Sequence, residues 1–64
     1  MYKIKAARVC LGIKQKDMAD KLGITPQYLN NIEKGKVEPR RDLMIKISEL
    51  LNSNVQTLFF SDEE

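Results

Sequence analysis

Hydrophobic residues recur along the chain at the three- and four-residue spacings of amphipathic helices, and no stretch shows the clear alternation of apolar and polar residues that marks a strand. The spacing predicts a first helix over about residues 3–11 and a second over about residues 15–22. Each stops at a glycine, Gly12 or Gly23, a residue that suits a helix C-terminus. Their inner faces are predicted to carry Ile4, Ala7, Arg8, Leu11, Met18, Ala19 and Leu22.

A third helix is predicted to begin after Thr25, a residue type that caps helix N-termini well. Pro26 then takes the first helical position, where its missing N–H costs nothing. Gly35 is predicted to end the helix. Because a short turn containing Gly23 joins this helix to the second one, the two have the spacing of a helix-turn-helix unit. The inner side of the third helix is predicted to carry Leu29, Ile32 and Glu33.

Two more helices are predicted after a loop over residues 36–39. One covers about residues 41–51 and is broadly apolar, and a last short one covers residues 55–59, where Asn54 can act as its cap. Five short helices without a strand predict an all-α protein, folded as a compact five-helix bundle.

With 64 residues, the chain has room for one small domain. Its 42% hydrophobic and 31% charged residues are typical of a globular protein and not of a disordered one. The last three residues are all acidic, so we predict a single domain over residues 1–61 and an acidic tail over residues 62–64. Without that tail the chain carries eleven bases and six acids, which suggests a polyanion as partner.

The chain lacks the residues on which most enzymes and metal sites depend. With no histidine and one cysteine, Cys10, it has too few ligands for a structural zinc ion and can form neither a histidine-based catalytic site nor an internal disulfide. We therefore expect no enzymatic activity, no metal and no cofactor, and no small-molecule ligand is evident. Because there is no apolar run of about 18 residues and no signal peptide, we expect no membrane contact and a cytoplasmic protein.

Two stretches resemble a known family. The segment GIKQKDMADKLGIT over residues 12–25 and the segment IEKGK over residues 32–36, followed by Pro39, resemble the helix-turn-helix of the phage repressor and Cro family, also called the XRE family. The pattern is specific as an ensemble, and the resemblance extends over about residues 4–59. It implies a lambda-repressor-like fold whose third helix enters the major groove of double-stranded DNA, and homodimers that bind two-fold operators with half-sites about 34 Å apart.

The function that this resemblance implies is sequence-specific regulation of transcription, most simply repression by blocking a promoter. An antitoxin-like protein that binds both DNA and a toxin is one alternative. A protein-interaction module that keeps the fold without binding DNA is another. The outward face of the third helix favours DNA, because it is polar and is not acidic.

The candidate base contacts lie on that outward face. A helical wheel at about 100° per residue places Gln27 and Asn31 opposite the inner side, with Asn30 beside them. Since Gln and Asn can pair bidentately with adenine N6 and N7, we predict that Gln27 and Asn31 contact bases, with an ordinary solvated face as the alternative. By resemblance, Thr25, Pro26 and Asn30 line the same edge. Pro26 replaces a polar residue, so its contact is expected to be apolar, as with a thymine methyl group.

Candidate phosphate contacts surround the same helix. In the family that the chain resembles, the residue at the position of Gln15 binds phosphate and braces the recognition helix, and the N-terminus of a helix favours an anion. Lys14 replaces the usual Ser or Thr cap, which leaves this N-terminus poorly capped although a lysine there suits DNA. The other candidates, for each of which simple solvation is the alternative, are Tyr28, Lys34, Lys36, Arg40 and Arg41.

One arginine and one glutamate are predicted to have a structural role. Arg8 lies in the apolar stripe of the first helix, where a lone charge would be costly, and Glu33 lies on the inner side of the third helix. We predict an ion pair between Arg8 and Glu33, a pair for which the resembling family is known. The alternative is that both charges reach solvent independently.

The end of the last helix suggests a contact between two copies of the chain. Leu58 is expected to complete the core, and the adjacent Phe59 and Phe60 cannot easily both point inward. One of them, with Val55, can form the self-complementary patch of a homodimer. A singly exposed aromatic side chain is the alternative.

Overall fold

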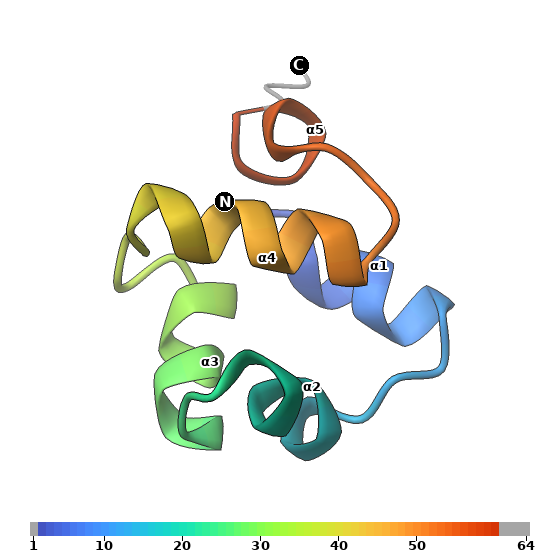
Figure 1. The fold of residues 1–64 in the computed structure, drawn as a ribbon, viewed down its shortest axis with the longest axis vertical. Helices are drawn as coiled ribbons and strands as arrows, with labels where there is room; N and C mark the ends of the chain where they lie inside the picture. The colour runs from blue at the N-terminus through green and yellow to red at the C-terminus, as the bar shows by residue number, and fades with distance from the viewer. Residues whose placement is uncertain (1, 61–64) are drawn as a thin grey trace.

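Five helices make up the part of the chain that the computed structural model describes, residues 2–60, and no strand occurs within these residues (Figure 1). The prediction of an all-α, five-helix protein is confirmed, and every helix begins and ends within two residues of its predicted position. The predicted domain end at residue 61 and the acidic tail over residues 62–64 lie outside the described residues. In chain order the helices are α1 (Ile4–Cys10), α2 (Gln15–Leu22), α3 (Pro26–Glu33), α4 (Arg41–Leu50) and α5 (Val55–Phe59).

The helix α4 runs across the middle of the molecule, with α5 on one side and the pair α2 and α3 on the other, while α1 lies behind it (Figure 1). The residues just before α1 contact α5. The backbone N–H of Lys3 donates to the carbonyl oxygen of Leu58 at 3.0 Å, and the ring of Tyr2 lies edge-on against that of Phe59 at a centroid distance of 4.9 Å. The first and last helices are therefore joined directly.

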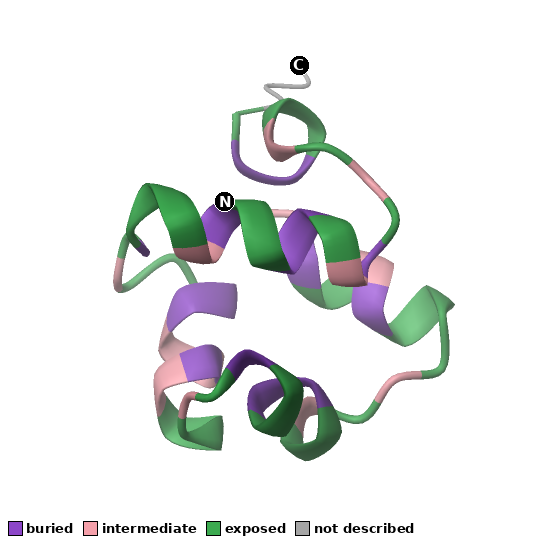
Figure 2. Ribbon diagram, viewed as in Figure 1, coloured by how far each residue is buried: buried purple, intermediate pink, exposed green. Residues whose placement is uncertain are grey.

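The core is built from the inward faces of all five helices, which Figure 2 shows in purple. Ala19 is 1% exposed on α2, which packs against both α3 and α4, and its small side chain permits this close approach. A domain of this size buries only about 60% of the surface that its unfolded chain exposes, so few core residues are dispensable. The buried hydrophobic residues are Ile4, Met18, Ala19, Leu22, Leu29, Ile32, Met44, Ile47, Leu51, Leu58 and Phe59.

Leu11 departs from the predicted inner face of the first helix, because its side chain is 51% exposed. The helix ends at Cys10, and Leu11 already has the C-cap conformation, with φ −88° and ψ 0°. The chain then turns through Gly12 at φ +72°. This turn carries the Leu11 side chain away from the core, whereas Arg8, one helical turn earlier, stays buried.

The turn between α2 and α3 is set by one glycine and one hydroxyl group. Gly23 has the left-handed conformation, with φ 72° and ψ 29°, which costs a glycine nothing. Two residues later, Oγ1 of Thr25 accepts a hydrogen bond from the backbone N–H of Tyr28 at 3.1 Å. The predictions of a glycine stop and of a threonine cap are confirmed.

Candidate nucleic-acid interface

The helix α3 has a buried and an accessible face, divided as the helical wheel predicts. Leu29 and Ile32 are fully buried and Glu33 is 6% exposed, so these three residues hold the helix against the rest of the fold. The candidate base contacts lie at the beginning of the helix and on its other side. Thr25, Pro26 and Gln27 are exposed, and Asn30 and Asn31 are partly exposed.

Arg8 and Glu33 form the expected ion pair beneath α3. Nε of Arg8 donates to Oε2 of Glu33 at 2.7 Å, and Nη2 donates to Oε1 at 3.2 Å. The third donor, Nη1, reaches the carbonyl oxygen of Ile13 at 2.8 Å. The two side chains are 8% and 2% exposed. The pair therefore joins α1, the α1–α2 linker and α3 through one buried, bidentate contact.

Gln15, the first residue of α2, extends this network to the surface of α3. Its Nε2 donates to Oε1 of Glu33 at 3.1 Å and to Oδ1 of Asn30 at 3.3 Å. The resemblance predicts that Gln15 braces the recognition helix, but it does not predict that Asn30 is the hydrogen-bonding partner of Gln15. The spacing contains the signal, since Asn30 and Glu33 lie three residues apart and hence share one side of α3, within reach of the same side chain.

The N-terminus of α2 lacks a side-chain cap, as predicted. Lys14 occupies the cap position in an extended conformation, with φ −76° and ψ 147°, and its side chain makes no capping hydrogen bond. The backbone N–H groups of the first turn therefore receive no acceptor from the side chain of Lys14. Such groups, with the positive end of the helix dipole, favour an anion.

Exposed basic residues precede α2 and follow α3, and the one acid on α3 is paired with an arginine. Glu33 is the only acidic residue between positions 24 and 37 of the sequence, and Arg8 pairs with it. Tyr28 on α3 is partly exposed. The cationic candidates are all exposed, before α2, at the end of α3, in the following loop and at the start of α4: Lys14, Lys34, Lys36, Arg40 and Arg41.

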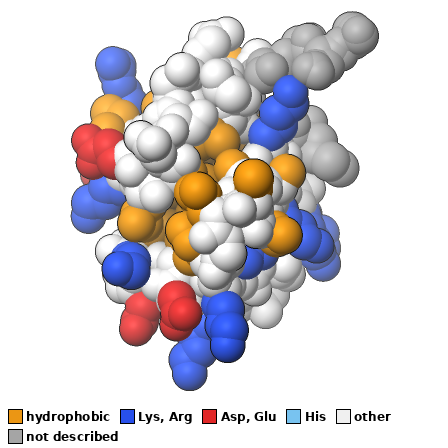
Figure 3. All heavy atoms as spheres, turned by 90° about the vertical axis from the view of Figure 1, so that its right-hand side faces the viewer, with side chains coloured by type: hydrophobic (Ala, Val, Ile, Leu, Met, Phe, Trp, Pro, Cys, Tyr) orange, Lys and Arg blue, Asp and Glu red, His pale blue; other side chains and the backbone are white. Residues whose placement is uncertain are grey.

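The face that Figure 3 shows has a different character. It is the right-hand side of Figure 1, where α1 ends and the linker to α2 lies, and hydrophobic side chains occupy its middle with charged side chains of both signs around them. Val9 and Leu11, at the end of α1, are 59% and 51% exposed. The helix α3 lies on the opposite side of the molecule in Figure 1.

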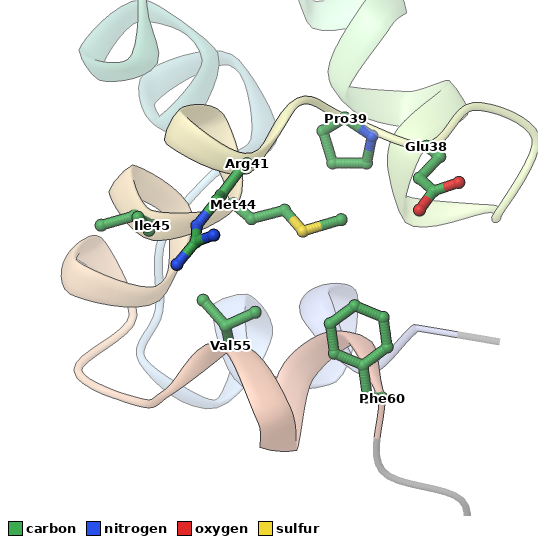
Figure 4. A pocket seen from close by; sticks show the side chains of 7 residues that line it. All are labelled: Glu38, Pro39, Arg41, Met44, Ile45, Val55 and Phe60. Atoms are coloured by element: carbon green, nitrogen blue, oxygen red, sulfur yellow. The ribbon is translucent and has the colours of Figure 1, made fainter.

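The structure distinguishes the two adjacent phenylalanines. Phe59 is 7% exposed and packs against Tyr2, so the sequence-based choice of Phe59 as a possible dimer contact is corrected: the ring is part of the core. Phe60 is 54% exposed, and Val55 is partly exposed. Both line a hollow of about 490 Å³ between α5, the beginning of α4 and the loop before it (Figure 4). The other lining residues are Glu38, Pro39, Arg41, Met44 and Ile45.

No cluster of metal-ligating side chains is present within residues 2–60. The cysteine, Cys10, is exposed and free. In the same part of the chain, no helix has the length and apolar character needed to cross a membrane.

Comparison with known proteins places the chain among relatives of similar length. A family model described as helix-turn-helix matches residues 4–58. An uncharacterised HTH-type transcriptional regulator of Archaeoglobus fulgidus is 32% identical over 62 residues, which cover 97% of this chain and 89% of that protein. A second uncharacterised HTH-type transcriptional regulator, from Methanocaldococcus jannaschii, is also 32% identical over 62 residues, covering 97% of this chain and 94% of that protein.

A third relative is longer. The HTH-type transcriptional regulator ImmR of Bacillus subtilis is 36% identical over 61 residues, which cover 95% of this chain and 48% of that protein. The family match extends from the first residue of α1 into α5 and so contains the complete α2–turn–α3 unit. The chain therefore belongs to the helix-turn-helix family of transcriptional regulators, which are DNA-binding proteins and not enzymes.

Proposed function

We propose that this protein is a sequence-specific regulator of transcription, most simply a repressor, that places α3 in the major groove of double-stranded DNA. The observation that carries the proposal is the composition of the accessible face of α3. That face presents the amides of Gln27, Asn30 and Asn31, it carries no unpaired acid, and exposed cations lie directly before α2 and directly after α3. Side-chain amides suit base edges, and cations suit the phosphates on either side of the groove.

The base contacts are assigned to the beginning and the accessible side of α3. Gln27 is exposed and has no hydrogen-bonding partner within residues 2–60, so its amide is free to pair bidentately with adenine. Asn31, one helical turn later, follows it along the groove. Thr25 already caps α3, which leaves its hydroxyl proton available to a base or a phosphate. Pro26 offers an apolar surface to a thymine methyl group. The full set of proposed base contacts is Thr25, Pro26, Gln27, Asn30 and Asn31.

The phosphate contacts are assigned to the residues around α3. Both N–H groups of the Gln15 side chain are used within the protein, so the contact proposed for this residue falls to its backbone N–H at the uncapped start of α2. Affinity should then fall steeply with salt, because each neutralised phosphate releases counterions. Arg41, which also lines the hollow beside α5, belongs to this set. The proposed phosphate contacts are Lys14, Gln15, Tyr28, Lys34, Lys36, Arg40 and Arg41.

A homodimer on a two-fold operator completes the proposal. The hollow beside α5 is mostly apolar, through Val55, Phe60 and Ile45, and it also carries Glu38 and Arg41 (Figure 4). A two-fold axis through such a patch brings the apolar side chains of two copies together. It also allows Glu38 of each copy to face Arg41 of the other, which makes the patch self-complementary.

Selection from a random duplex library, followed by titration of the enriched site across salt concentrations, tests this function. We expect one two-fold sequence to be enriched and the logarithm of its binding constant to fall linearly with the logarithm of the salt concentration. Binding that is equal for all sequences and disappears at physiological salt would contradict a DNA-binding regulator. That result would instead favour a protein-interaction module or an antitoxin-like role with the same fold.

A further inference from the structure

We propose that the buried ion pair determines which end of the Asn30 amide faces DNA, so that Asn30 contacts a base as a hydrogen-bond donor. Four residues on three helices form the chain of hydrogen bonds that leads to this orientation: Arg8, Glu33, Gln15 and Asn30. The inference rests on the proposed DNA-binding function and specifies one base preference within it.

The first step is the orientation of the Gln15 amide. Arg8 binds both oxygens of the Glu33 carboxylate, at 2.7 Å and 3.2 Å, and so holds Glu33 as an anion that can only accept hydrogen bonds. Gln15 approaches Oε1 of Glu33 to 3.1 Å. An amide oxygen at that place would set two acceptors against each other, so Gln15 must turn its Nε2 toward the carboxylate.

The second step is the orientation of the Asn30 amide. The Nε2 group of Gln15 has two N–H donors, and the one that does not bind Glu33 points to Asn30 at 3.3 Å. A donor requires an acceptor, so Asn30 must present Oδ1 to Gln15. In a planar amide the nitrogen lies on the other side of the group from the oxygen. The donor group Nδ2 of Asn30 is therefore directed away from Gln15, on a residue that remains partly exposed.

The third step concerns the bases that such a group can contact. Bidentate pairing of asparagine with adenine needs the oxygen to accept from N6 and the nitrogen to donate to N7. Because Oδ1 of Asn30 points to Gln15, the group that remains for the groove is the donor Nδ2. In the major groove, guanine offers O6 and N7 as acceptors, thymine offers O4 and adenine offers N7, whereas cytosine presents the donor N4. Asn30 should consequently disfavour cytosine, whereas Gln27, which has no partner within residues 2–60, keeps both ends free for adenine.

The decisive variant is Gln15→Met, which nearly preserves the length of the side chain and removes its two donors. Without them the Asn30 amide can turn over, present Oδ1 to the groove and accept from cytosine N4. Gln56→Met is the matched control, since Gln56 is an exposed residue of α5 outside the network. Asn30→Ala identifies the base position that Asn30 contacts, because selection from the duplex library loses its preference there.

At the position so identified, the wild type and the Gln56→Met control should favour guanine, thymine or adenine over cytosine by roughly tenfold, as for one good base contact. In Gln15→Met, cytosine should become as favourable as the preferred base, while the other positions of the site keep their preferences. A second variant, Asn30→Asp, retains the acceptor for Gln15 and presents another acceptor to DNA. It should favour cytosine, whose N4 donates.

Several results would overturn the inference. A wild-type preference for cytosine at the Asn30 position, no effect of Asn30→Ala at any position, or no change of preference in Asn30→Asp would each do so. If Gln15→Met remains folded by circular dichroism and keeps the wild-type preference, the orientation is not set by Gln15. Failure of the underlying function has a different signature, since the wild type would then enrich no sequence at all.

Discussion

Glu33 of α3 accepts two hydrogen bonds from Arg8 of α1, 25 residues away in the sequence, at 2.7 Å and 3.2 Å. The exposed fractions of the two side chains are 2% and 8%. Within residues 2–60 the other hydrogen bond to this carboxylate comes from Gln15. One buried carboxylate thus connects the stability of the fold with the position of the helix that we propose to enter the major groove.

Replacing Arg8 by methionine should lower the free energy of unfolding by about 3–5 kcal/mol, because Glu33 stays buried while its charge loses its partner. Urea denaturation followed by circular dichroism measures the loss. The control is Lys5→Met, a similar change at an exposed position of the same helix, which should alter stability by no more than about 0.5 kcal/mol. The double variant Arg8→Met with Glu33→Met should recover much of the loss, since it removes both charges. Equal losses in Arg8→Met and Lys5→Met would contradict a structural role for the pair.

Replacing Gly23 by alanine should lower the free energy of unfolding by about 1–2 kcal/mol. The cost comes from the backbone alone, because Gly23 has φ +72° and an added Cβ meets no atom within 4 Å. Asparagine tolerates this conformation better than alanine, so Gly23→Asn should lose less. Thermal unfolding of the two variants checks the order, and an equal loss in both would show that the left-handed conformation is not the cause.

The helices could be predicted well because their ends are marked by local chemistry. Thr25 and Asn54 each accept a hydrogen bond from a backbone N–H three residues later, at 3.1 Å and 2.8 Å, as capping residues do. Spacing alone failed at Leu11, where the helix ends one residue before the side chain could pack inward. Periodicity says which face a residue occupies but not where the last helical turn stops.

The candidate site was predictable in its residues and less so in their arrangement. A helical wheel separates the buried Leu29 and Ile32 from the exposed Gln27 because that division needs only the period of one helix. The spacing places Asn30 and Glu33 on one side of α3, but the contact between Gln15 and Asn30 also depends on how α2 and α3 pack, which the spacing within either helix does not contain. Which of Phe59 and Phe60 is buried likewise depends on a residue far away in the sequence, since the ring of Phe59 packs against that of Tyr2.

Two substitutions on α3 should separate base recognition from phosphate binding. Gln27→Ala should weaken binding to the selected operator by about 1–3 kcal/mol and relax specificity at one position, because the free amide of Gln27 is proposed to contact a base. Lys34→Ala should weaken binding about equally for all sequences and reduce the salt slope by about 1, because it removes one phosphate contact. Fluorescence anisotropy with several duplexes and salt concentrations measures both effects. If Lys34→Ala altered base preference, or Gln27→Ala altered only the salt slope, the assigned roles would be wrong.

Phe60→Ser should raise the dissociation constant of the proposed dimer by tenfold or more, since burying a phenylalanine contributes about 1.5–3 kcal/mol and about 1.4 kcal/mol corresponds to tenfold. The free energy of unfolding of the monomer should hardly change, because the ring is 54% exposed there. Val9→Ser is the control, since Val9 is 59% exposed on a different face. Sedimentation equilibrium measures the constants. A wild type that is monomeric at high micromolar concentration, with and without operator DNA, would exclude the dimer.

Charge reversal provides a stricter test of how two copies would meet. Glu38 and Arg41 line the same hollow. In the proposed dimer, a two-fold axis through this hollow places Glu38 of each copy opposite Arg41 of the other copy. Glu38→Arg should therefore weaken association by placing like charges together, and Arg41→Glu should do the same. The double variant, in which the two charges are exchanged, should regain most of the lost affinity. Sedimentation without DNA keeps any effect of Arg41 on phosphate binding out of the measurement. If the double variant associates no better than either single one, Glu38 and Arg41 do not meet across a two-fold axis.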